Sequence, residues 1–121
     1  MIDTGELEVQ RQLTEEFIAA DSVQIALERS VRTPDGAGGY ATADPVPLAE
    51  QQFRLIPQQD GATERLTADG KAVNPAYVLM GSYTADLQRW DEFELAGIRY
   101  QVVFINQNRQ YEVKGEVAYL G

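Results

Sequence analysis

The last thirty residues contain the strongest constraint on the fold, a close succession of segments with two-residue periodicity. Glu92–Leu95 alternates charged and apolar residues, and Ala96-Gly97 is typical of a two-residue hairpin turn. Ile98 to Ile105 is a longer apolar-rich segment, and Gln110 to Tyr119 follows after the polar turn of residues 106–109. Three strand-like segments joined by short turns predict an antiparallel meander.

Three further candidate strands lie upstream. Val23–Leu27 and Gln52–Ile56 alternate in the same way, and Ala76–Met80 is a third candidate. About six short strands separated by turn residues predict a mainly β fold, a small antiparallel barrel or sandwich. With 121 residues, the chain has room for a single domain, in which we expect residues 21–121 to form the β part.

Residues 3–20 are expected to form an amphipathic helix, which Asp3 and Glu6 begin as a capping box. Its apolar residues at helical spacing are Val9, Leu13, Phe17 and Ile18. Such a stripe usually packs against the protein's own domain, and we expect the same here. The alternative is a helix that docks onto a partner.

Two long connections, residues 30–50 and 57–75, are rich in glycine and proline. We expect both to be long loops without regular structure. Long loops in a small domain are commonly functional. Loops without catalytic residues favour a protein that inserts them between neighbouring subunits.

The composition excludes several kinds of chemistry, because the chain has neither cysteine nor histidine. Thiolate nucleophiles, Cys/His zinc sites and a Ser-His-Asp triad are impossible. The Asp-Gly pairs at Asp35, Asp60 and Asp69 lack the spacing of a calcium loop, so we interpret them as turns. We therefore expect no enzyme activity, no catalytic residues, no metal and no cofactor.

Three carboxylates close in sequence, Asp91, Glu92 and Glu94, leave a glycosidase-like pair as a remote alternative. A solvated strand face explains them better. Tyr100 and Phe104 are interpreted as core and cross-strand aromatics and not as base-stacking residues.

Acidic charge dominates the chain, which carries a net charge of −9. Residues 1–30 hold seven acidic residues against two arginines, a net charge of −5. This balance argues against a basic nucleic-acid-binding surface. The N-terminal sequence lacks the pattern of a signal peptide, and no apolar run is long enough to span a membrane, so we expect a soluble protein made in the cytoplasm.

The arrangement of these segments resembles the head-closure, or stopper, proteins of the head–tail connector of long-tailed bacteriophages. The early part of the resemblance is a strand ending in arginine, Val23–Arg29, followed by the Gly-rich Asp35–Gly39. The later part consists of Tyr83–Leu87, Trp90–Leu95, the Gly turn Ala96-Gly97, Ile98–Val102 and the final strand from Tyr111 to Tyr119. The resemblance covers roughly residues 21–121, and Trp90 stands where the family usually has glycine.

The resemblance implies a structural virion protein located in the neck of the phage and assembled in the host cytoplasm. Copies would form a ring, twelve-fold by family resemblance, beneath the portal and its adaptor. The ring would seal the DNA-filled head and present a docking surface to the tail terminator or tail tube. DNA would pass through the channel without sequence-specific binding, and no membrane would be involved.

The resemblance also suggests which residues act. One loop would gate the channel, and we assign this role to residues of the second connection: Asp60, Gly61, Glu64, Arg65, Asp69, Gly70 and Lys71. Contacts to the neighbouring subunit or adaptor are assigned to Asp35, Gly36, Gly38, Gly39, Tyr40 and Trp90. For Trp90, a second interpretation explains the sequence equally well: its side chain plugs one end of the barrel.

Other functions remain open at this stage. The chain is alternatively a small-barrel protein-binding module, or a related head–tail adaptor or tail-completion protein. A carboxylate enzyme is a distant third.

Overall fold

The computed structural model describes residues 4–30, 32–34, 40–42, 45–58, 63–106 and 110–120. One helix, α1 (Thr4–Ala20), precedes the sheet. The strands of the first half are β1 (Val23–Ile25), β2 (Glu28–Arg29), β3 (Arg32–Pro34), β4 (Tyr40–Thr42), β5 (Val46–Pro47) and β6 (Gln51–Pro57). Those of the second half are β7 (Arg65–Leu66), β8 (Ala72–Val73), β9 (Tyr77–Ser82), β10 (Glu92–Leu95), β11 (Ile98–Asn106) and β12 (Glu112–Tyr119).

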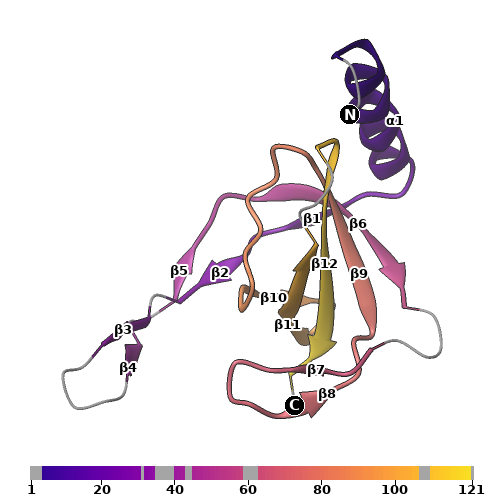
Figure 1. Cartoon of the computed structure of the whole chain (residues 1–121). Coiled ribbons are helices and arrows are strands. Elements are labelled where there is room, and N and C mark those ends of the chain that lie inside the picture. Colours follow the sequence, from indigo (N-terminus) through magenta and orange to yellow (C-terminus); the bar gives the residue numbers. More distant parts are fainter. Residues whose placement is uncertain are drawn as a thin grey trace.

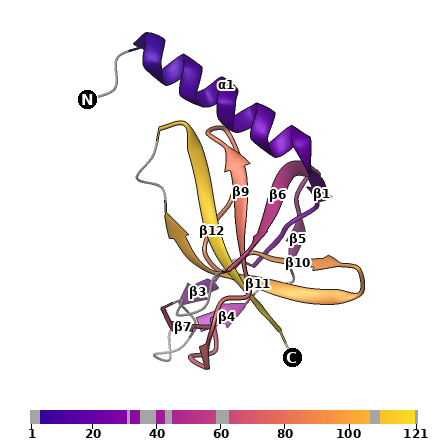
Figure 2. The same ribbon diagram turned by 90° about the vertical axis from the view of Figure 1, so that its right-hand side faces the viewer.

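The fold is mainly β, as the alternation predicted, and its main sheet is antiparallel. The strand order in this sheet is β1-β6-β9-β12-β11-β10-β2-β5. The sheet curls into a half-barrel, and α1 lies across one end of it (Figures 1 and 2). The predicted strands agree with β6, β9, β10, β11 and β12 to within about two residues at each end.

The segment from β1 to β2 links two distant places in the sheet. β1 pairs with β6, whereas β2 pairs with β10, although only Ala26 and Leu27 separate β1 from β2 in the chain. Leu27 is fully buried, together with Ile25. Of the predicted strand over residues 23–27, only Val23–Ile25 is a strand, and Leu27 lies in the link to β2 with its side chain still directed into the core.

The core fills the inside of the curled sheet. Phe53 on β6, Leu79 on β9 and Phe93 on β10 are buried there with Val102 and Val117. Aromatic side chains form cross-strand pairs, as expected for Tyr100: its ring stacks on that of its register partner Phe93, with centroids 5.1 Å apart. The ring of Tyr119, the other register partner of Tyr100, has its centroid 5.3 Å from that of Tyr100.

The turn between β10 and β11 has the geometry that its sequence indicated. Ala96 and Gly97 both have positive φ, 53° and 80°. Positive φ at both central residues matches the right-handed twist of the strands in a two-residue hairpin. The pairing of β11 with β12 is interrupted by a bulge between Val102 and Phe104.

The two long connections differ from the expected irregular loops, because both contain paired strands. In residues 30–50, β3 pairs with β4, and β5 pairs with β2. In residues 57–75, β7 pairs with β8. Strands of two or three residues are too short to show alternation, and the turn residues around them dominated the sequence pattern.

Candidate functional site

The candidate gate is a folded hairpin on the barrel. Asp60 and Gly61 lie outside the described residues, whereas Glu64 is exposed just before β7. Arg65 lies in β7, and Asp69, Gly70 and Lys71 form the turn between β7 and β8. This β7–β8 hairpin lies at the end of the barrel opposite α1 (Figures 1 and 2).

Arg65 fastens the hairpin to the outside of the main sheet. Its Nε and Nη2 atoms donate to the carboxylate of Glu116 on β12, at 3.3 and 3.0 Å. Its guanidinium also lies 3.7 Å from the ring centroid of Phe104 on β11. A bidentate pair combined with an aromatic stack restricts Arg65 more than a single surface ion pair would.

A second set of bonds fixes the turn of the hairpin. The backbone N–H of Ala68 donates to the Gln101 side chain at 2.9 Å, and the N–H of Lys71 donates to the buried Thr67 hydroxyl at 3.1 Å. Gly70 has a φ of 83°, which glycine adopts without strain. The described part of the candidate gate is therefore held at both its stem and its turn.

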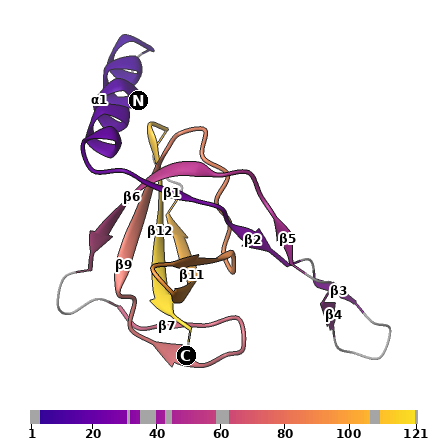
Figure 3. The same ribbon diagram turned by 180° about the vertical axis from the view of Figure 1, so that it is seen from behind.

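Of the candidate contact residues, Tyr40 lies on an arm, which we define as β2, β3, β4 and β5. Asp35, Gly36, Gly38 and Gly39 lie outside the described residues, and Tyr40 begins β4. The β3–β4 part of the arm extends well away from the barrel (Figures 1 and 3). The structure therefore places Tyr40 on a projecting ribbon.

Ion pairs anchor the base of this arm. Arg29 on β2 donates to both carboxylate oxygens of Asp91, at 2.9 and 2.8 Å, and also contacts Asp86. Asp91 is only 1% exposed and also accepts the backbone N–H of Gln88 at 2.8 Å. The hydrogen bonds to Asp91 are the main reason why the pKa of Arg29 is raised.

The neighbouring residue of β2 is anchored as well. Arg99 on β11 donates to Glu28 at 2.8 Å and to Glu92 at 3.1 Å, and the bond to Glu28 is the main cause of its raised pKa. Arg99 and Asp91 of the barrel therefore hold β2 of the arm in place. Glu94, the third carboxylate of this segment, is exposed.

Trp90 lies beside this anchor, with a φ of 79° and partial exposure. The guanidinium of Arg89 lies 4.1 Å from its ring centroid. A pocket of about 530 Å³ is lined by Trp90 and Arg29 and also by Asp69 of the β7–β8 hairpin. The structure therefore brings together one residue predicted for the gate and one predicted for contacts.

The sequence interpretation missed the Arg29–Asp91 pair, whose members lie 62 residues apart. Neither residue stands in a motif that relates them. The one signal in the sequence that could have indicated the pair is the position of Asp91, directly before the alternating strand Glu92–Leu95.

Helix α1 packs on the barrel, but not through the predicted stripe. Its buried residues are Thr14 and Ile18. Arg11 of the same face donates to the Gln110 carbonyl at 3.2 Å and lies over the Tyr83 ring at 3.7 Å. Of the predicted stripe, only Ile18 is buried.

The other three residues of the stripe face solvent. Val9, Leu13 and Phe17 are 55%, 53% and 43% exposed. Arg54 on β6 covers part of Phe17: its guanidinium lies 3.8 Å from the ring centroid, and it donates to the Phe17 carbonyl at 2.8 Å. Asp3, the predicted helix cap, lies outside the described residues.

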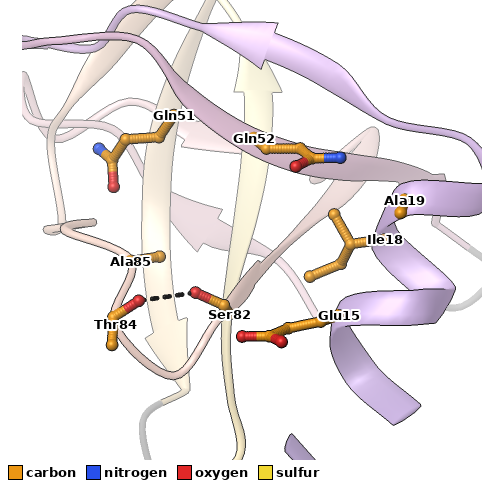
Figure 4. A pocket seen from close by; sticks show the side chains of 8 residues that line it. All are labelled: Glu15, Ile18, Ala19, Gln51, Gln52, Ser82, Thr84 and Ala85. Atoms are coloured by element: carbon orange, nitrogen blue, oxygen red, sulfur yellow. Dashed lines mark hydrogen bonds between the residues drawn. The ribbon is translucent and has the colours of Figure 1, made fainter. Parts of the chain in front are cut away.

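A second pocket, of about 440 Å³, lies between α1 and the adjoining strands β6 and β9 (Figure 4). Ile18 forms one wall, and the Glu15 carboxylate points toward Ser82 (Figure 4). Gln51, also in its lining, exchanges two hydrogen bonds with the Asp86 backbone, at 3.0 and 2.7 Å. The two hydrogen bonds of Gln51 hold the backbone at Asp86 beside β6 at the edge of this pocket.

Within the described ranges, no three carboxylates gather in a way that would hold a metal ion. The described helix is not long and apolar enough to cross a membrane. No protein-family model matches the chain, and a search of curated proteins found no significant match. The geometry of the arm, the hairpin and α1 is therefore the basis for assigning a function.

Proposed function

We propose that the protein is a head-closure component of a bacteriophage neck, which forms a ring below the portal and adaptor. The observation that carries the proposal is the arm, a β-ribbon that leaves the barrel and ends far from it (Figures 1 and 3). A ribbon of this kind supplies surface for a neighbouring subunit.

The anchored base of the arm suits this role. Glu28 and Arg29 attach β2 to the barrel through Arg99 and Asp91, so the base of the arm leaves the body in a fixed direction. A ring requires head-to-tail contacts that repeat with one fixed rotation. An arm of fixed direction reaches each neighbour in the same way and supports such closure.

The charge of the protein suits contact with a channel that DNA traverses. The chain carries a net charge of −9, and both Glu64 and Asp69 are exposed on or beside the β7–β8 hairpin. Like charges repel, so an acidic lining lets DNA slide without binding. Because Arg65 and Gln101 hold the hairpin, we expect it to act as one unit.

Electron microscopy of DNA-filled, tailless heads tests the proposal directly. Heads that carry portal and adaptor but lack this protein are mixed with the purified chain. We expect a ring of added density below the adaptor. Heads that gain no density would overturn the proposal.

The gating role of the hairpin has a separate test. Virions carrying Glu64→Lys with Asp69→Lys should release DNA more slowly, because two cations would attract the backbone. Glu50→Lys with Glu94→Lys is the matched control, since both glutamates are exposed and lie outside the hairpin. Equal release rates for the two variants would show that this hairpin is not the gate. The proposal of a ring would be unaffected.

A further inference from the structure

The exposed side of α1 is an apolar surface that the barrel contacts at Phe17, through Arg54, and leaves open at Val9 and Leu13. Val9, Leu13 and Phe17 are spaced four residues apart, so they form one stripe along the helix. The helix is held by a different face, that of Arg11, Thr14 and Ile18. Burial of Val9 or Leu13 therefore requires another surface.

The charges around the stripe restrict what that surface can be. The helix has four glutamates against one arginine, a net charge of −3. That arginine, Arg11, is already engaged with Tyr83 and the Gln110 carbonyl. A second copy docked stripe to stripe would bring the glutamates of both helices together, which is unfavourable. Anionic lipid surfaces are disfavoured for the same reason.

We propose that α1 docks through Val9, Leu13 and Phe17 into an apolar groove rimmed by lysine and arginine on an adjoining connector protein. This inference rests on the proposed function, which supplies the adjoining protein. Helix-in-groove recognition uses apolar anchors at this spacing, and basic rim residues would pair with the glutamates beside them. The protein that contains the groove is therefore not a second copy of this chain.

The test compares binding of variants to purified tailless heads that carry portal and adaptor, and separately to purified tails. Val9→Gln with Leu13→Gln should weaken binding to one of the two by at least about tenfold, because two half-exposed apolar anchors are lost. Both positions are exposed, so the melting temperature should stay within a few degrees of the wild type. Ile98→Gln, which changes a similarly exposed apolar residue of β11 on the barrel, should bind as the wild type does.

A charge variant gives a second, independent readout. Glu16→Lys, at an exposed position next to Phe17, should also weaken binding, and binding of the wild type should weaken as salt is raised. Both results follow from a basic rim and would not follow from a purely apolar contact.

Several results would overturn the inference. If the wild type and the Val9/Leu13 variant bind equally well to heads and equally well to tails, the stripe does not take part in docking. A wild-type dimer in sedimentation, or binding to anionic phosphatidylserine vesicles, that the variant loses would assign the stripe to a second copy or to lipid. Wild-type protein that binds neither heads nor tails would overturn the proposed function and this docking role with it.

Discussion

Removal of the Asp91 carboxylate should destabilise the protein far more than removal of its neighbour Asp86, although both contact Arg29. Asp91 is buried and accepts three hydrogen bonds, two from Arg29 and one from the Gln88 backbone. The side chain of Asp86 is 58% exposed. The variants Asp91→Ala and Asp86→Ala therefore form a matched pair around one guanidinium.

The expected magnitude follows from the burial of each partner. Arg29 has a side chain only 19% exposed, so loss of Asp91 leaves a largely desolvated charge whose remaining partner is the exposed Asp86, and an unpaired backbone N–H at Gln88. Breaking a buried pair costs about 3–5 kcal/mol, whereas an exposed pair contributes about 0–1 kcal/mol. The unfolding entropy of about 2.1 cal/mol/K per residue converts 1 kcal/mol into roughly 4 °C for this length. We expect Asp91→Ala to lower the melting temperature by about 12–20 °C and Asp86→Ala by less than about 4 °C.

Urea denaturation and thermal melting followed by circular dichroism measure both changes. A third variant, Arg29→Met with Asp91→Leu, replaces the pair by apolar side chains and should recover much of the loss, because no buried charge remains. Equal, small losses for Asp91→Ala and Asp86→Ala would refute the reasoning that burial decides the cost. A double variant no better than Asp91→Ala would show that the cost does not come from the unpaired charge.

Three further predictions concern the barrel itself. Gly81→Ala should cost about 1–3 kcal/mol in urea denaturation, because its Cβ would lie 2.7 Å from the Ala85 Cβ and 2.8 Å from the Phe53 ring; an unchanged midpoint would contradict this packing. Ala96→Asn should raise the free energy of unfolding by roughly 0.5 kcal/mol, since asparagine tolerates the positive φ of this turn better than alanine; a lower urea midpoint would count against the turn geometry. Burial raises the pKa of Tyr100 above its ordinary 10.0, so its contribution to stability is present below pH 10 and is lost as the pH rises further. Melting temperatures at pH 9 to 11 should therefore fall less steeply for Tyr100→Phe than for the wild type, and parallel curves would refute the assignment.

The sequence predicted the strands that show alternation or form a short apolar run between turns. β6, β10 and the middle of β12 alternate in burial, so their inward residues recur at every second position. β9 and β11 bury consecutive residues and are recognisable as apolar runs bounded by turn residues. The turn at Ala96-Gly97 was also predictable, because few dipeptides suit a two-residue hairpin. The confirmed fold class rests on these elements.

The remainder depends on contacts between distant residues. The side of α1 that packs contains Ile18 with Arg11 and Thr14, and the last two are not apolar and leave no hydrophobic signal. The Arg29–Asp91 anchor joins the arm to a loop far along the chain, and single-sequence patterns do not relate such positions. The hairpin formed by β7 and β8 is likewise held by Arg65 and Glu116, a pair 51 residues apart.

The position of β12 has a consequence for how the protein is made. β12 lies in the interior of the main sheet, between β9 and β11, and contributes Val113 and Val117 to the core. The sheet therefore cannot assemble before β12 has left the ribosome, and until then Leu27 and Phe53 lack part of their core. A deletion that removes β12 takes away the middle of the sheet and not an edge strand. A tag or fusion placed before α1 leaves this order of events unchanged.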